Sequence, residues 1–202
     1  MKRRSAHLQY NWWKYCLVVV VSAIVWMVVF DMIAAPEKNE KIKISFIGDD
    51  FSHEELEETL CTILPELTEQ SIKSISVESP VNGQSNDYYS VLATRAHGAD
   101  IMIFEESALP ETVGETYFDP LSTEKLENYV AVDAYYCEDG VAYGILLWDG
   151  EGKNRFSQFY SGDERCYLFL THTTVNAADV VSNGSAEDDA ALQIIKYLLG
   201  EQ

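Results

Sequence analysis

The chain has 202 residues, of which 47% are hydrophobic and 23% charged, a balance typical of a folded protein and not of a disordered one. Its charge is uneven, because residues 36–202 hold ten of the 14 Lys and Arg but 32 of the 33 Asp and Glu, a formal charge of −22. So acidic a surface repels phosphate, which excludes nucleic acid and anionic lipid headgroups as partners, whereas cations or a basic protein would be attracted.

An apolar segment near the N-terminus, residues 15–35, predicts a transmembrane helix. It has 21 residues with Asp31 as its single charge, and roughly 20 residues cross the hydrocarbon core of a bilayer. Basic residues precede it, so residues 1–14 are expected in the cytoplasm and residues 36–202 outside the cell membrane, as in a single-pass protein. Those basic residues are Lys2, Arg3, Arg4 and Lys14. The alternative is a cleaved signal peptide, but Ile33 fits a cleavage site after Ala35 poorly.

The expected location of the domain outside the cell membrane allows its cysteines to form disulfides, because disulfides persist in oxidising compartments. Three of them follow the membrane segment: Cys61, Cys137 and Cys166. Cys61 is expected on the apolar face of a helix, as a small core residue. Cys137 and Cys166 lie in strand-like runs and are the candidate pair for a disulfide. An odd number of cysteines also permits no bridge at all, so both alternatives stay open.

Strands and helices alternate in the first half of the outer domain, which is expected over residues 43–200 after a polar linker at 36–42. The strands are predicted at 42–48, 74–79 and 99–107. The first helix begins after Ser52, with Glu55 completing a capping box, and the second helix ends at Gly98. This alternation predicts parallel strands joined by crossovers, with Ile101–Phe104 as a central strand buried on both faces.

The second half of the domain reads differently. A helix is expected within 121–131, a hairpin over 132–150 with its turn at Asp139-Gly140, and a strand within 164–174. A closing helix stops before Gly200. The predicted fold class is therefore α/β: one extracytoplasmic three-layer domain with a mostly parallel sheet, preceded by a single transmembrane helix.

Catalytic signatures are absent from the sequence. There is no G-x-S-x-G elbow, phosphate-binding glycine loop or C-x-x-C pair. The segment "HEELE" at 53–57 begins like the helix motif of zinc proteases, but Glu57 replaces the second histidine ligand. The sequence thus predicts a non-enzymatic protein without catalytic residues, metal or cofactor.

A binding site is predicted where the three parallel strands end, because ligands of open parallel sheets bind beyond the carboxyl ends of the strands. Acids and aromatic rings there suit a polyol, a sugar or a cationic solute. The candidate residues in the three loops are Asp49, Asp50, Phe51, Asn82, Glu105, Glu106, Ser107, Tyr117 and Phe118. The structural alternative is that Phe51 packs on the first helix, the acids are solvated, and Tyr117 and Phe118 cover the sheet edge.

Three segments give the chain a resemblance to one lobe of the extracellular solute-binding proteins of bacterial ABC importers. They are "KIKISFIGDD", "YYSVLATRAHGADIMIFEES" and "DGVAYGILL", and "CYLFLTHTT" with "DDAALQIIKYLLG" is similar to the return strand and closing helix of that lobe. The resemblance covers about residues 41–200. It implies an α/β lobe and solute binding, although family members have two lobes and the chain has room for one.

Two functions follow as expectations. The first is non-enzymatic recognition of a small solute at the three-loop edge, coupled to transport or sensing. The second is a one-lobed interaction or scaffold module that binds a protein partner in a membrane complex and no solute. A concave pocket of acids and aromatic rings at the edge favours the first function, and a flat or filled edge favours the second.

Overall fold

The protein is described by a computed structural model that covers residues 2–79, 88–111, 117–151, 154–182 and 188–201. The chain divides into two compact units, Met1–Pro36 and Glu37–Gln202. The first unit is helix α1 (Lys2–Ala34), whose 33 residues span about 50 Å. Among the described residues, α1 contains the one stretch long and apolar enough to cross a membrane, Trp12–Phe30, which overlaps the predicted span and ends before Asp31.

The segment predicted as a linker, residues 36–42, is largely part of the second unit. Lys38–Glu40 form the 3-10 helix η1, and the first strand already begins at Lys41. Backbone contacts hold η1 against the domain: the Lys73 N–H donates to the carbonyl oxygen of Glu40 at 2.7 Å. A polar composition alone did not reveal these long-range bonds.

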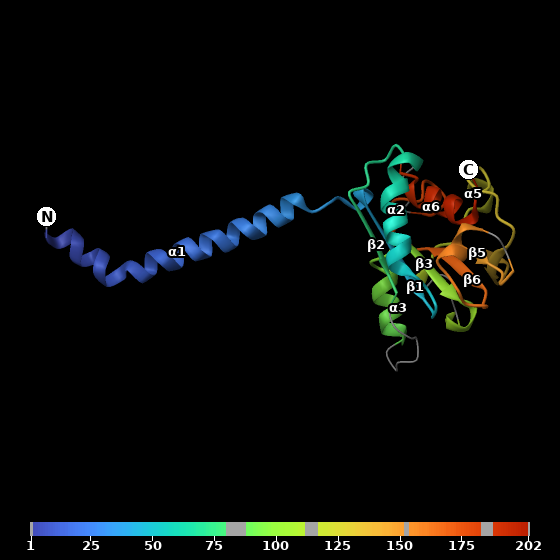
Figure 1. Cartoon of the computed structure of the whole chain (residues 1–202), viewed down its shortest axis with the longest axis horizontal. Coiled ribbons are helices and arrows are strands. Elements are labelled where there is room, and N and C mark those ends of the chain that lie inside the picture. Colours follow the sequence, from blue (N-terminus) through green and yellow to red (C-terminus); the bar gives the residue numbers. More distant parts are fainter. Residues whose placement is uncertain (1, 80–87, 112–116, 152–153, 183–187, 202) are drawn as a thin grey trace. The chain divides into compact units, whose positions relative to one another are not determined.

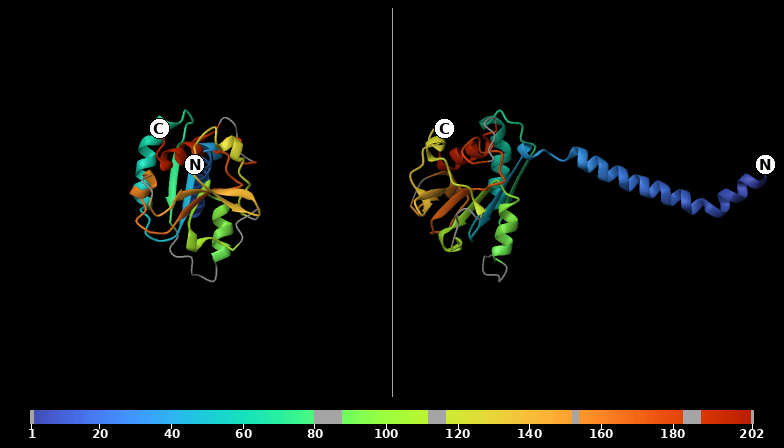
Figure 2. Two further views of the ribbon diagram at one scale, coloured as in Figure 1. Left: turned by 90° about the vertical axis from the view of Figure 1, so that its right-hand side faces the viewer. Right: turned by 180° about the vertical axis from the view of Figure 1, so that it is seen from behind.

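Six strands of the described residues form one mixed sheet in the order β2-β1-β3-β6-β5-β4 (Figures 1 and 2). The strands are β1 (Lys41–Ile47), β2 (Ser74–Glu78), β3 (Ile101–Glu105), β4 (Tyr135–Glu138), β5 (Val141–Trp148) and β6 (Cys166–Leu170). The helices of the domain are α2 (His53–Leu67), α3 (Tyr88–Ala96), α5 (Thr123–Leu126) and α6 (Ala190–Leu199), with 3-10 turns η2 (Glu106–Ala108) and η3 (Arg155–Gln158).

The α/β class is confirmed, but the sheet is not parallel throughout. Strand β1 pairs in parallel with both β2 and β3, as the first-half pattern predicted. Strand β6 is antiparallel to β3 and to β5, and β5 is antiparallel to β4. Strands β1, β2, β3 and β5 therefore run one way and β4 and β6 the other. The predicted turn joins β4 to β5, with positive φ angles of 51° at Asp139 and 83° at Gly140.

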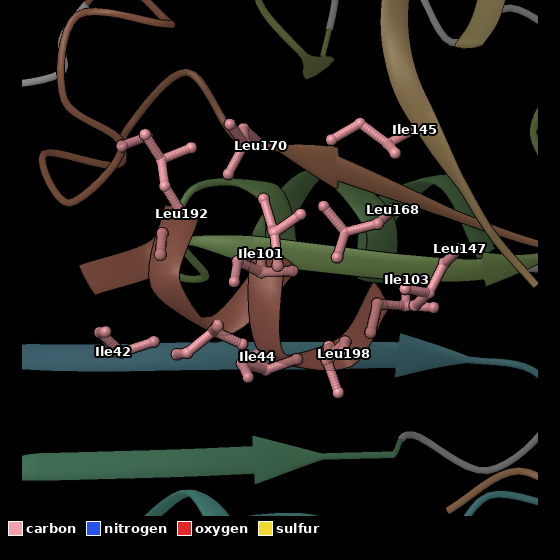
Figure 3. Packing of buried hydrophobic residues seen from close by; sticks show 14 of the residues in the cluster. Ile42, Ile44, Ile101, Ile103, Ile145, Leu147, Leu168, Leu170, Leu192 and Leu198 are labelled. Atoms are coloured by element: carbon pink, nitrogen blue, oxygen red, sulfur yellow. The ribbon is translucent and has the colours of Figure 1, made fainter. Parts of the chain in front are cut away.

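Apolar side chains pack on both faces of the sheet. Strand β3 is buried along its whole length, with Ile101 and Ile103 facing one cluster and Met102 and Phe104 the other, so it is the predicted central strand. Helices α2 and α6 cover the first face, and Leu92 and Ala96 of α3 cover the second. Figure 3 shows the first cluster where α6 crosses the sheet.

The cysteines form no disulfide in this structure. Cys137 lies on β4 and Cys166 on β6, and β5 runs between them. Cys137 lies opposite Ala142 of β5 and Cys166 opposite Trp148, so the two cysteines are offset by about 20 Å along the strands as well as by two strand spacings, far beyond the roughly 7 Å between Cα atoms that a disulfide can bridge. Cys61 is exposed, so its prediction as a core residue was wrong.

Candidate functional site

Glu105, the last residue of β3, is buried at the predicted edge, with 8% of its surface exposed. Its Oε2 accepts the backbone N–H of Asp49 at 3.0 Å, and its Oε1 accepts the hydroxyl of Tyr160 at 2.8 Å. A Cβ atom at Gly48 would overlap the Glu105 carboxyl group, so only glycine fits there. The carboxylate therefore joins the loop after β1 to the segment around Tyr160.

The loop after β1 is tied down by its neighbours as well. Asp50 has a positive φ of 56°, which aspartate tolerates, and its carbonyl oxygen accepts the Ser161 N–H at 3.1 Å. The ring of Phe51 stacks on Phe46 of β1 with 4.2 Å between centroids. Phe51 thus packs on the core, as the structural alternative supposed, although against the strand and not only the helix.

The residues after β3 are engaged by the segment before β6. The Glu106 N–H donates to the carbonyl oxygen of Arg165 at 2.8 Å, and its carboxylate lies 4.0 Å from the Arg165 guanidinium. The Ser107 N–H donates to Oε2 of Glu164 at 3.0 Å. Their hydrogen-bonding groups are therefore partly occupied within the chain.

Tyr117 lies at the other end of the sheet. Its neighbour Phe118 forms a bridge with Thr171, which follows β6 at the end that pairs with the start of β3. The Nδ1 atom of His172 is 3.0 Å from the Tyr117 carbonyl oxygen. The structure thus gathers Asp49, Asp50, Phe51 and Glu105 but not Tyr117, and the predicted Asn82 lies outside the described residues.

Burial controls the titration of the groups around Glu105. Desolvation raises the pKa of Glu105 above its usual range, against the lowering effect of the hydrogen bonds from Asp49 and Tyr160. Burial also raises the pKa of the Tyr160 hydroxyl, and that of the Cys166 thiol to about 12. A thiol that stays protonated at neutral pH is a poor nucleophile, and the hydrogen bonds of Glu105 hold two segments of the fold together.

A second polar cluster, for which the sequence carries no local signal, lies at the opposite end of the sheet. Asp100 accepts hydrogen bonds from the Lys43 N–H at 3.0 Å, from Thr174 Oγ1 at 2.7 Å and from Asn176 Nδ2 at 3.1 Å. The side-chain oxygen of Asn176 accepts Nε2 of Gln70 at 2.8 Å. Asn176 also donates to the carbonyl oxygen of Lys38 in η1, and Gln70 accepts the Ala190 N–H at the start of α6, so the cluster connects η1, β1, α6 and the residue before β3, which is a structural role.

Helix α2 is rich in glutamates whose negative charge is not balanced by ion pairs with the described residues. Its sequence contains five glutamates and neither lysine nor arginine. The ion pairs found among the described residues involve none of the five. One of them, Glu57, uses its carboxylate to accept the Val77 N–H of β2 at 2.8 Å. Ser52 is the N-cap residue of α2, as predicted, but its side chain does not form the expected capping hydrogen bond.

Hollows flank α2 on two sides. One of about 840 Å³ lies between its C-terminal turns and the start of β2, with Leu64, Pro65, Ile72 and Ile75 in its lining. Another, about 600 Å³ and open, lies between α2 and η3. Neither is lined by the predicted edge residues. At the predicted edge, Glu105 and Phe51 are packed within the chain, whereas the two hollows place recessed surface beside α2.

A separate hollow of about 420 Å³ lies at the C-terminal end of α6. It is lined by Trp148, Asp133, Asp149, Asn154 and the residues from Leu199 to Glu201 among others. Acids and an aromatic ring, expected at the three-loop edge, therefore also meet in this hollow. Within the described residues, no group of three or more His, Cys, Asp and Glu side chains is arranged to hold a metal ion.

Comparison with protein-family models, with curated proteins and with solved structures found no match to this chain. The resemblance to solute-binding proteins therefore stays a prediction.

Proposed function

We propose that the chain is a non-enzymatic recognition protein, anchored in the cell membrane by α1, whose outer domain binds a basic protein partner through α2. The basic residues before the apolar stretch Trp12–Phe30 support an orientation with the N-terminus in the cytoplasm and the domain outside. The formal charge of −22 on residues 36–202 supports attraction of a basic partner.

The observation that carries this proposal is the uncompensated acidity of α2. Glutamates in the first turn, such as Glu54 and Glu55, are favoured by the helix dipole. Glu58 lies beyond that turn and Glu66 lies in the last turn, where the dipole disfavours an anion. Glu54 and Glu58 also repel each other across one helical turn. A cationic partner would relieve both costs.

The test compares two triple variants of the full chain in nanodiscs of zwitterionic lipid, with a capped lysine-rich peptide as the probe. Replacing Glu55, Glu58 and Glu66 with glutamine is expected to weaken binding about tenfold, since three exposed ion pairs are worth about 0.5 kcal/mol each. It should also reduce the dependence of the dissociation constant on salt.

The control variant removes the same charge elsewhere, at the exposed Glu111, Glu124 and Glu127. It is expected to bind the peptide nearly as tightly as the unchanged chain. Equal losses in the two variants would mean that net charge, and not α2, attracts the peptide, and the proposal would be refuted.

A second candidate function, recognition of a small solute, is favoured by the hollow at Trp148. Its carboxylates and the carbonyl end of α6 suit a cation or a polyol, and an indole ring can stack on either. Trp148 is the one tryptophan after residue 35, so a Trp12→Phe, Trp13→Phe, Trp26→Phe background isolates its fluorescence. A saturable change with one class of sugars, amino acids or polyamines, abolished by Asp133→Asn, would support this candidate; no change with any class would exclude it.

A further inference from the structure

Strand β2 forms one edge of the sheet, because it pairs with β1 and with no other described strand. The Val77 N–H donates to the Glu57 carboxylate, so the backbone groups of Val77 point away from β1. Backbone directions alternate along a strand, so Ser76 points toward β1 and Ile75 points outward again. The outward N–H and carbonyl groups of Ile75 have no hydrogen-bond partner among the described residues.

The two outward-pointing positions of this edge differ: a side chain blocks the backbone N–H of Val77 but not that of Ile75. At Val77 the side chain of Glu57 occupies the outward N–H, a device that discourages pairing with another strand. At Ile75 no described side chain occupies the outward N–H, and Ile75 lines the hollow of about 840 Å³. A donor and an acceptor that point the same way on one residue are complementary to the backbone of an extended chain.

The hollow has the chemistry to receive the side chains of such a chain. Pro65 and Leu67 from α2 and Ile72 before β2 supply apolar surface. Glu66 and Glu69 are exposed on its rim and form no ion pair with the described residues. The C-terminal end of α2 adds further negative potential. A second copy of this chain is disfavoured as the occupant, because it would bring the same negative charge.

We propose that the partner of α2 presents an extended basic segment, which adds as a strand to the edge of β2 at Ile75. Its backbone pairs with the outward groups of Ile75, one apolar side chain packs on Pro65 and Ile72, and a lysine or arginine meets Glu66. Glu57 limits the added strand to the start of β2. This inference rests on the proposed function, which requires a basic partner but not this mode of binding.

The experiment uses the full chain in zwitterionic nanodiscs and a short capped peptide in which lysine alternates with valine. Two derivatives carry N-methyl groups on the amides of one edge or of the other, which blocks strand pairing on that edge and leaves the charge unchanged. The derivative methylated on the edge that faces β2 is expected to bind about tenfold more weakly than the parent, since a lost hydrogen-bonded pair is worth about 1–1.5 kcal/mol. The derivative methylated on the other edge is expected to bind as tightly as the parent.

A protein variant provides the matched test. Ile75→Pro removes the outward N–H, and proline is tolerated on an edge strand, so the affinity should fall as it does for the methylated peptide. Ile75→Val keeps the N–H and should bind normally. Hydrogen exchange of the Ile75 amide in the unchanged chain, slowed by the parent peptide, gives a readout that does not depend on whether the proline variant folds.

The outcomes separate the two proposals. If both methylated peptides bind as tightly as the parent and Glu66→Gln still weakens all three, strand addition is refuted and the acidic-helix function stands. If the Ile75 amide exchanges at the same rate with and without saturating peptide, strand addition is refuted as well. If no lysine-containing peptide binds at all, the proposed function fails, and this inference fails with it.

Discussion

The hydrogen bond between Tyr160 and Glu105 offers a direct test of how Glu105 is held at the end of β3. Tyr160→Phe keeps the ring, which lies 5.8 Å from Phe46 and 5.6 Å from Phe156 between centroids, and removes only the hydroxyl. A hydrogen bond to an ionised carboxylate is worth about 1.5–3 kcal/mol, and a loss of about 2 kcal/mol lowers the Tm of a domain this size by about 4–8 °C.

The pH dependence of this loss follows from the raised pKa of Glu105. Below the unfolded pKa, about 4.3, the carboxyl is protonated in both states and burial carries no ionic penalty. As the pH rises through the folded pKa, the carboxylate ionises in its buried site, and stability from this group is lost. The hydroxyl of Tyr160 limits that loss. Tyr160→Phe should therefore cost about 1 kcal/mol near pH 4, where a neutral hydrogen bond is lost, and about 2 kcal/mol at a pH above the folded pKa, where the carboxylate is ionised.

Thermal unfolding of the full chain in mild detergent, followed by circular dichroism at both pH values, measures the difference. Glu105→Gln supplies the control, because its amide does not titrate, and the effect of Tyr160→Phe in that background should be the same at pH 4 and at the higher pH. An equal shift at both pH values in the unchanged background, or a pH-dependent one in the Glu105→Gln background, would refute the assignment of the effect to Glu105.

Three further predictions concern the core and the cysteines. Asn176→Ala should lower the free energy of unfolding by about 2–4 kcal/mol, because it leaves several buried partners unpaired, as denaturant titration would measure. Gly144→Ala should cost about 1–3 kcal/mol, since the new Cβ would lie 2.6 Å from the buried ring of Phe169, and unchanged stability would contradict that packing. Native alkylation should modify Cys137 rapidly and Cys166 only after unfolding, and a reductant should leave the Tm unchanged; protection of both thiols until reduction would mean that the bridge exists.

The parts of the fold that depend on local patterns were predictable from the sequence. The apolar run Ile101–Phe104 is the central strand, Asp139-Gly140 forms the hairpin turn, and Gly200 ends the last helix with a φ of 89°. The direction of β6 was not predictable, because a buried strand reads the same whether its neighbour is parallel or antiparallel. The helix expected within 121–131 is limited to Thr123–Leu126, and the local sequence pattern does not predict where it ends.

The candidate site was predictable only in part. The rule for open sheets located Asp49 and Glu105 together at the carboxyl ends of β1 and β3, as the structure has them. That rule says nothing about what else reaches the same edge. Tyr160 comes from a segment 55 residues beyond Glu105 and occupies its carboxylate, and no periodicity or motif signals that contact. Burial of a functional-looking acid is thus a tertiary property, which sequence spacing does not contain.

The acidic residues of the domain divide by what their carboxylates do inside the chain. Glu105 accepts two hydrogen bonds that secure a loop, and Glu57 protects an edge strand, so these charges have structural uses. Glu58 and Glu66 have no ionic partner among the described residues, and the dipole of α2 does not favour their positions. Charge that the fold does not need is free to serve recognition, which is why the search for a partner should begin at α2 and at the open end of β2.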